Sequence, residues 1–317
     1  ARGLSVLLDG VFNHVSRRNR IVQDAQSAGP DSDAGRMVRW CAGRLDVFEG
    51  HSDLVALNHD NPAVREHVTR IMNYWCGRGV DGWRLDAAYS VNPEFWAAVL
   101  PSVREKYPDV WIFGEVIHGD YASIVRASGM DSVTQYELWK GIWSSIESRN
   151  FFELDHALGR HNEFSDAFTP MTFVGNHDVT RIASRVGQDG AVLATAILAT
   201  IGGIPLIYYG DELAYRGVKE ERFGGDDDIR PVFPASPADL SNLGADTLRA
   251  HQSLLGLRRR HPWLVDARTE SLDLTNERYV YRTGVPGVEP LIVELDVRDG
   301  CSVLIREAGQ VVWSSGA

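Results

Sequence analysis

The sequence predicts an α/β protein built on a parallel sheet and followed by a smaller β domain. Short runs of aliphatic and β-branched residues alternate with segments of helical periodicity, and this alternation is typical of parallel strands joined by helices. The runs are almost continuously apolar, as expected for strands that are buried on both faces. Beyond residue 262 the pattern changes to closely spaced short strands, which favours an antiparallel domain at the C-terminal end.

Six apolar runs are the predicted parallel strands, namely residues 4–8, 80–85, 110–113, 132–135, 172–174 and 204–208. The predicted helices are residues 62–76, 93–107, 190–201 and 246–260. Asn61 and Asn92 each precede a proline, and an asparagine N-cap followed by proline in the first turn favours a helix start. The polar residues 15–61 interrupt the alternation, and a loop of this length is usually functional or a small subdomain. The strands predicted for the C-terminal domain are residues 278–281, 291–295, 303–305 and 311–313.

Composition limits the partners that this chain would bind. Its 317 residues are 44% hydrophobic, which is enough for a large core. A formal net charge of -11 favours neither nucleic acid nor acidic membranes as partners. The cysteines Cys41, Cys76 and Cys301 are odd in number and form no CxxC pair, so we expect neither a disulfide framework nor a zinc site. No run of about 18 apolar residues and no signal peptide are visible. We therefore expect no membrane span and favour a cytoplasmic location, although residue 1 does not resemble a natural start.

Acidic and histidine side chains follow five of the six predicted strands at their carboxyl ends. They are Asp9 with Asn13 and His14, then Asp86, Glu115, His177 with Asp178, and finally Asp211 with Glu212. In an α/β barrel the active site lies at this face. A single aspartate at a strand end often only caps the next helix, but five such sites in register are harder to explain by capping. For Asp211 and Glu212 a structural turn is the favoured interpretation.

Two of these carboxyl groups have contrasting surroundings in the sequence. Arg84 precedes Asp86 by two residues, so both point to the same face of a strand, and an arginine there holds a carboxylate ionised and oriented. Glu115 is flanked by apolar residues, and an apolar setting favours a protonated carboxyl group. An ionised and a protonated carboxyl group on adjacent strands match the requirements of glycoside hydrolysis.

At this point a family resemblance emerges. The segments DGVFNH (9–14), GWRLD (82–86), FGEV (113–116) and FVGNHD (173–178) resemble, in order, the four conserved regions of glycoside hydrolase family 13, the α-amylase superfamily. GGIPLIYYGDE (202–212) is similar to the segment around the last strand of the family barrel. The resemblance extends from residue 1 to about residue 260.

The resemblance implies a TIM (β/α)8 barrel that lacks its first two βα units. Strands three to eight would lie in residues 1–14 and 62–262, and residues 15–61 would be the domain inserted after the third strand. Residues 263–317 would form the small C-terminal antiparallel β domain. Two barrel edges would then be open, from which we expect self-association and little or no activity of residues 1–317 alone.

The resemblance also assigns roles to single residues. Asp86 would be the nucleophile, Glu115 the acid and base, and Asp178 the third carboxylate, which binds sugar hydroxyls. The expected substrate-binding residues are Arg84, His14, His177 and Tyr89, and the expected supporting residues are Asp9 and Asn13. Tyr89 stands where many members carry a Lys-His pair. The family usually takes an aromatic residue from its first strand to stack on the sugar, and Phe12, Trp83 and Tyr208 are candidates to replace it here. The acidic run 226–228 before Arg230 would be a surface loop near the cleft.

The implied function is retaining hydrolysis of α-1,4-glucosidic bonds in starch, glycogen or maltooligosaccharides through a covalent glycosyl-aspartate. The alternatives within the superfamily are an α-glucosidase, a trehalose synthase and a glucan transferase. A non-catalytic interaction domain and an inactive fragment remain further alternatives. The chemistry needs no cofactor. Many α-amylases bind calcium through an asparagine matching Asn13 and an aspartate of the insert, where this sequence has Asn58, so calcium stays an open alternative.

Overall fold

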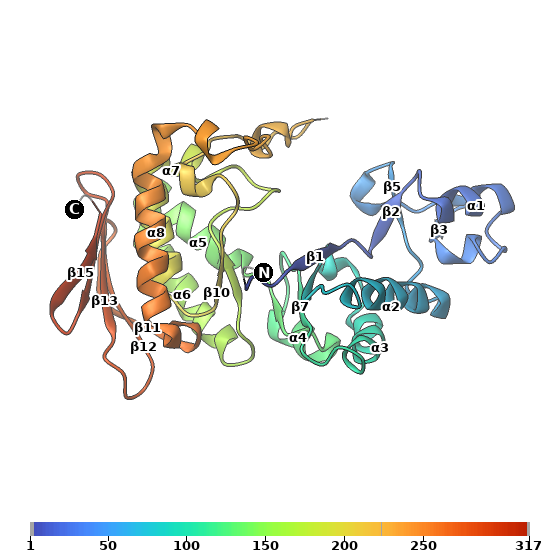
Figure 1. The fold of residues 1–317 in the computed structure, drawn as a ribbon, viewed down its shortest axis with the longest axis horizontal. Helices are drawn as coiled ribbons and strands as arrows, with labels where there is room; N and C mark the ends of the chain where they lie inside the picture. Colours follow the sequence, from blue (N-terminus) through green and yellow to red (C-terminus); the bar gives the residue numbers. More distant parts are fainter. Residues whose placement is uncertain (1–2, 223, 316–317) are drawn as a thin grey trace. The chain divides into compact units, whose positions relative to one another are not determined.

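A computed structural model describes residues 3–222 and 224–315. The chain divides into two compact units, Ala1–Thr134 and Gln135–Ala317. Figure 1 shows the secondary structure of both units. Each of the six predicted apolar runs contains or overlaps a strand, and the first four of these strands lie in the first unit.

A parallel sheet forms the centre of the first unit, in the order β1-β6-β7-β8. Its strands are β1 (Leu7–Gly10), β6 (Gly82–Leu85), β7 (Trp111–Gly114) and β8 (Ser132–Val133). The helices that alternate with them are α2 (Pro62–Cys76), α3 (Pro93–Arg104) and α4 (Tyr121–Ser128). The predicted caps are confirmed, because the side chains of Asn61 and Asn92 accept hydrogen bonds from Ala63 N and Glu94 N. The alternation of strand and helix therefore has the local origin that the sequence indicates.

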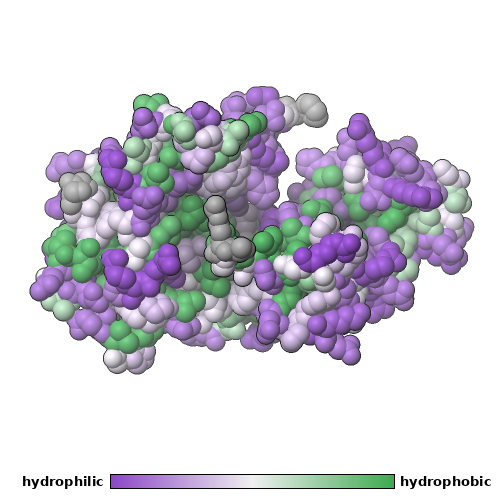
Figure 2. Space-filling model, in the orientation of Figure 1, coloured by the Kyte–Doolittle hydropathy of each residue, from purple (hydrophilic) through white to green (hydrophobic). Residues whose placement is uncertain are grey.

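The segment between β1 and α2 begins and ends as an antiparallel ribbon of β2 (His14–Ser16) and β5 (Leu54–Ala56). Between these strands lie α1 (Arg20–Ala28), η1 (Gly35–Met37), β3 (Trp40–Cys41), β4 (Arg44–Leu45) and η2 (Phe48–Gly50). Helix α1 was not predicted; it is short, and the Asn19 side chain caps it by accepting from Ile21 N. In Figure 2 the visible face of this segment is largely hydrophilic, with small apolar patches.

The second unit contains the parallel pair β9 (Met171–Phe173) and β10 (Ile204–Leu206). Its helices are α5 (Tyr136–Ser148), α6 (Phe151–Ser165), α7 (Ile182–Thr200) and α8 (Ala245–Arg260). Helices α5 and α6 were not predicted, and α7 begins eight residues earlier than expected. Short 3-10 turns follow β10 and α8, namely η4 (Asp211–Leu213), η5 (Asp227–Ile229), η6 (Pro237–Asp239), η7 (Asn242–Gly244) and η8 (Pro262–Asp266).

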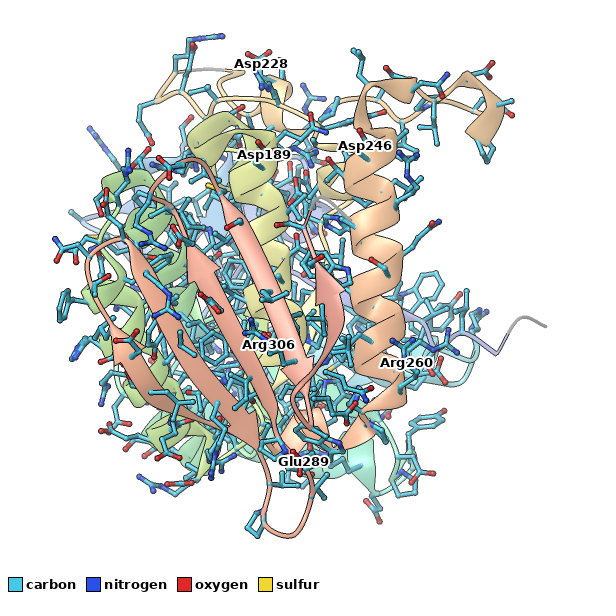
Figure 3. The ribbon with its side chains drawn as sticks, turned by 90° about the vertical axis from the view of Figure 1, so that its left-hand side faces the viewer. Asp189, Asp228, Asp246, Arg260, Glu289 and Arg306 are labelled. Carbon is cyan, nitrogen blue, oxygen red and sulfur yellow. The ribbon has the colours of Figure 1, made fainter. Side chains whose placement is uncertain are left out.

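An antiparallel sheet of consecutive strands ends the second unit. It consists of β11 (Arg268–Leu274), β12 (Arg278–Gly284), β13 (Leu291–Asp296), β14 (Ser302–Glu307) and β15 (Gln310–Ser314). Figure 3 shows this sheet in front of α7, with α8 beside it. The packing is largely apolar, and it includes a hydrogen bond of 2.6 Å between the hydroxyls of Tyr281 and Thr200, both fully buried. Strand β11 was not predicted, because its residues are mostly polar and exposed.

The helices in the described part of the chain include none that is long and apolar enough to span a bilayer.

Candidate active site

Arg84 occupies the centre of a charged cluster in the first unit. The register of the sheet places it opposite Asp9 on β1 and Phe113 on β7. Its Nη1 atom lies 2.7 Å from Asp9 Oδ1 and 2.8 Å from Asp86 Oδ1, and its Nη2 atom lies 2.8 Å from Glu115 Oε1. Parallel strands end at the same edge of a sheet, so carboxyl groups that follow β1, β6 and β7 converge there. The structure thus brings together Asp9, Arg84, Asp86 and Glu115, as the sequence predicts.

The charge of this cluster depends on Arg84. Burial by itself lowers the pKa of Arg84, but the negative charges of Glu115 and Asp9 outweigh burial and raise the pKa above its usual range. The guanidinium therefore stays cationic at every pH of interest. A cation with planar donors suits this position because it can contact several carboxylates at once in fixed directions.

Glu115 is 6% exposed, but its surroundings are not simply apolar. Besides Arg84 at Oε1, the backbone N–H of Ala87 donates to Oε2 over 3.0 Å. Ala87 has a left-handed backbone with φ of 45°, a conformation that non-glycine residues rarely adopt and that often occurs at functional sites. The expectation of an apolar setting for Glu115 therefore needs correction, because local backbone geometry supplies a donor that composition cannot reveal.

His14 lies beside the cluster, with Nε2 at 4.0 Å from Asp86 Oδ2. Its ring stacks on Phe48 at a centroid distance of 4.7 Å. Burial lowers the pKa of His14, and the charge of Asp86 offsets this only in part, so the imidazole is neutral near pH 7. Asn13 is buried, and its Nδ2 atom lies 3.3 Å from His14 Nδ1. The placement of Asn13 fits a supporting residue.

Tyr89 is tied both to the cluster and to the inserted segment. Its backbone N–H donates to the Glu115 carbonyl over 3.3 Å, and its hydroxyl donates to Glu49 Oε1 over 2.7 Å. Sequence reasoning missed Glu49, which lies 40 residues from Tyr89 in a polar loop and carries no motif. Only the fold of residues 15–61 places it here.

Asp178 and His177 belong to the second unit, in the loop after β9. His177 Nε2 lies 3.1 Å from Asp178 Oδ2, and Asn176 Oδ1 accepts from the backbone N–H of Asp178. Arg230 Nη2 contacts Asp178 Oδ1 over 2.8 Å, while its Nε donates to the His177 carbonyl. Arg230 is thus the partner that fixes the Asp178 loop, and the Asp-to-Arg stretch at 226–230 was the sequence signal for it.

A buried ion pair lies beneath the same loop. Arg181 is 1% exposed and Asp211 is 2% exposed, with Nη1 and Oδ1 2.9 Å apart. Arg181 also donates to the carbonyls of Tyr209 and Ile229. Asp211 therefore anchors a structural turn, as its sequence context indicated, whereas Arg181 was missed because nothing in its spacing distinguishes it from a solvated helix residue.

Two of the three aromatic residues suggested for stacking on a sugar belong to the core. Trp83 and Phe12 are 2% and 6% exposed, and their rings pack 5.8 Å apart. The ring of Tyr208 lies beneath the Arg181 guanidinium at 4.1 Å. The suggestion was wrong for Trp83 and Phe12. Successive residues of a strand point to opposite faces of the sheet, and Trp83 points to the face opposite that of Arg84, where it contacts Cys76 of α2, while Phe12 packs against Trp96 of α3.

The residues suggested for calcium do not form a fitting site. The side-chain nitrogen of Asn58 donates to the Arg36 carbonyl, and Asn13 contacts His14. Calcium takes six to eight oxygen ligands, usually including carboxylates. Within residues 3–222 and 224–315 there is no cluster of three or more His, Cys, Asp or Glu side chains arranged to hold a metal.

Comparison with known proteins places this geometry in a family. The α-amylase catalytic-domain model matches residues 44–268. Alpha-amylase 3 of Dictyoglomus thermophilum is 34% identical over 252 residues, which cover 70% of this chain and 50% of that protein. The maltogenic α-amylase of Bacillus acidopullulyticus is 30% identical over 286 residues, covering 83% of this chain and 46% of that protein. This chain thus spans about half the length of the curated relatives that it matches.

A solved structure shares the fold. The ligand-free cyclic α-maltosyl-(1→6)-maltose hydrolase of Arthrobacter globiformis matches with a TM-score of 0.81 at 22% identity, covering 99% of this chain and 74% of that one. The predicted fold class, a TIM barrel with a C-terminal β domain, is confirmed at that level. The chain therefore belongs to the α-amylase catalytic-domain family, glycoside hydrolase family 13.

Proposed function

We propose that the protein hydrolyses α-1,4-glucosidic bonds of starch, glycogen or maltooligosaccharides with retention of anomeric configuration. The observation that carries this proposal is the Arg84 guanidinium, which contacts both Asp86 and Glu115 over 2.8 Å. One cation keeps the two carboxyl groups close together, and retaining glycosidases need them roughly 5–5.5 Å apart. The names of the relatives, an α-amylase and a maltogenic α-amylase, support the substrate class.

In the first proposed step Asp86 is the nucleophile. One of its carboxylate oxygens attacks the anomeric carbon, and the bond between that carbon and the glycosidic oxygen breaks. Glu115 gives its proton to the departing oxygen, so the leaving sugar is a neutral alcohol. Arg84 supports this step because its contact with Oδ1 holds the Asp86 carboxylate in a fixed direction. The product is a glycosyl ester of Asp86.

In the second proposed step water replaces the leaving sugar. Glu115, now a carboxylate, takes a proton from the water while the water oxygen attacks the anomeric carbon, and the bond to Asp86 breaks. Two inversions at the same carbon give net retention. Arg84 and the Ala87 N–H both donate to Glu115, so they support this step by holding its carboxyl group in a fixed direction.

Asp178 is proposed as the third carboxylate, which binds sugar hydroxyls together with His177. The support is its position in the family pattern and its local setting, in which Arg230 and Asn176 hold the loop. Neutral His14 is proposed to donate to or accept from a sugar hydroxyl, a role that suits an imidazole whose pKa is lowered by burial.

The direct test is the anomeric form of the first product. Proton NMR of maltooligosaccharide hydrolysis should show the α-anomer before mutarotation. Asp86→Asn and Glu115→Gln should each lower the rate by roughly 10²- to 10⁴-fold. Glu115→Gln should be partly spared on an aryl glucoside whose leaving group needs no proton. Asp24→Asn in α1 removes an exposed carboxylate and is the matched control.

Three results would count against the proposal. A β-anomeric first product would mean inversion, and an active Asp86→Asn variant would exclude Asp86 as the nucleophile. An equal loss for Glu115→Gln on both kinds of leaving group would remove its acid role. Transfer of the glycosyl group to sugar instead of water would identify a glucan transferase of the same superfamily.

A further inference from the structure

The turn η2 (Phe48–Gly50) of the inserted segment has an unusual backbone. Glu49 has φ of 48° and ψ of 33°, the left-handed region that glycine favours, and the next residue, Gly50, has φ of 79°. Such a conformation is costly for a residue with a Cβ atom and persists only where surrounding contacts hold it. The side-chain contacts of this turn therefore indicate the role for which the strained backbone is retained.

Both side chains of the turn contact residues of the candidate site. The Phe48 ring stacks on His14 with an interplanar angle of 14°. Glu49 Oε1 accepts the hydroxyl of Tyr89 over 2.7 Å. His14 and Tyr89 come from the two chain segments that follow β1 and β6, and each was expected from the family pattern or its sequence position to bind sugar. One turn thus reaches both of them.

Stability alone does not account for this arrangement. Glu49 is exposed, and a hydrogen bond at an exposed carboxylate contributes little to folding because water competes for both groups. A strained backbone that positions an exposed carboxylate is therefore better explained by binding than by folding.

The chemistry of the pair suits a hydroxyl-rich, uncharged ligand. Burial and the carboxylate of Glu49 raise the pKa of Tyr89, so its phenol stays protonated and donates to Glu49. The phenolic oxygen can still accept a hydrogen bond. The second oxygen of Glu49 has no hydrogen-bond partner within residues 3–222 and 224–315, so it can accept as well. Two neighbouring acceptors match the hydroxyl donors of a glucose ring.

We propose that Glu49 is a specificity residue of this site. It holds Tyr89 in place, and the oxygen atoms of the two side chains accept hydrogen bonds from hydroxyls of an α-glucan next to the cleaved bond. This inference rests on the proposed function for the identity of the ligand. It differs from that function in assigning selectivity to a residue of the inserted segment that carries no family motif.

Binding of maltoheptaose, measured by calorimetry in the Asp86→Asn background, is the primary test, because it needs no turnover. Glu49→Ala and Tyr89→Phe should each weaken binding about 5- to 10-fold, the effect of one lost hydrogen bond to a sugar. The double variant should be no weaker than the worse single variant, because the two residues act as one unit. Glu49→Gln keeps one acceptor oxygen and replaces the other by an amide donor, so it should fall between wild type and Glu49→Ala.

One further measurement and one control variant separate an effect on binding from an effect on folding. Hydrogen exchange at the amides of residues 48–51 should increase in Tyr89→Phe, since the turn loses its anchor. Glu66→Gln removes an exposed carboxylate from α2 and should change neither binding nor exchange.

The inference is overturned if Glu49→Ala binds maltoheptaose within twofold of its Asp86→Asn parent, if the single effects add in the double variant, or if the parent does not bind maltoheptaose. Failure of the proposed function looks different. In that case the chain with native Asp86 produces no α-anomer, whereas the Glu49 variants still differ in binding.

Discussion

Replacing Arg181 by methionine removes the cation from the buried pair that Arg181 forms with Asp211. Burial raises the pKa of Asp211 to about 6, and Arg181 opposes this rise. Without Arg181 the pKa of Asp211 must rise further, because burial is then unopposed. Asp211→Asn would test the same pair from the other side.

The magnitude follows from these contacts. Above pH 8, breaking a buried pair by removing one partner should cost about 3–5 kcal/mol of the free energy of unfolding. Near pH 5, Asp211 is protonated in both proteins. The cost should then shrink to the hydrogen bonds that Arg181 donates to the Tyr209 and Ile229 carbonyls, about 1 kcal/mol each. Between these limits the penalty should grow with pH by up to ~1.4 kcal/mol per unit.

Pulsed hydrogen exchange across a urea series measures the loss in free energy of unfolding caused by Arg181→Met, because peptides of α7 report on the second unit by itself. Arg249→Met is the matched control: Arg249 is exposed on α8 and pairs with Asp246, so its loss should cost no more than about 1 kcal/mol at either pH. A penalty for Arg181→Met that is equal at pH 5 and pH 8 would refute the coupling to Asp211. A penalty as small as that of the control would refute the structural importance of the pair.

Two other features of the second unit give predictions for its stability. Burial lowers the pKa of His161 to about 4, so the unfolded chain binds a proton near pH 6.5 that the folded chain refuses. The contribution of His161 to the free energy of unfolding should be complete above pH 6.5 and fall by about 1.4 kcal/mol per pH unit down to pH 4. Urea titrations at several pH values should show a free energy of unfolding that depends less steeply on pH in His161→Gln. An unchanged pH dependence would contradict this. A Cβ atom on Gly175 would lie 2.4 Å from Asp211 Oδ2, so Gly175→Ala should destabilise the second unit. Gly159 lies on an open face of α6, so Gly159→Ala should stabilise the unit by up to ~1 kcal/mol. The same urea titration measures both effects.

The residues around Arg84 could be predicted because their positions depend on short-range rules. Strand residues two apart share a face, and the ends of parallel strands share an edge, so Arg84, Asp86 and Glu115 had to converge once the strands paired. The caps at Asn61 and Asn92 are equally local. Helices α5 and α6 escaped prediction because their apolar residues are interspersed with polar ones and their burial comes from tertiary packing: the two helices pack against each other, α5 also against α7 and α6 also against β11.

By itself, the sequence determined which carboxyl groups stand at strand ends, where helices α2 and α3 begin, and which family pattern the chain follows. These properties follow from periodicity and from contacts within a few residues along the chain. Only the tertiary structure decided the partners of Tyr89 and Arg181, since Glu49 and Asp211 lie 40 and 30 residues away from them. Contacts over such separations depend on how loops fold back, and no local propensity encodes that choice. The hydrogen bond that the Ala87 N–H donates to Glu115 was likewise decided by the tertiary structure. It depends on the left-handed backbone of Ala87, and a backbone conformation that is held by its surroundings leaves no trace in composition.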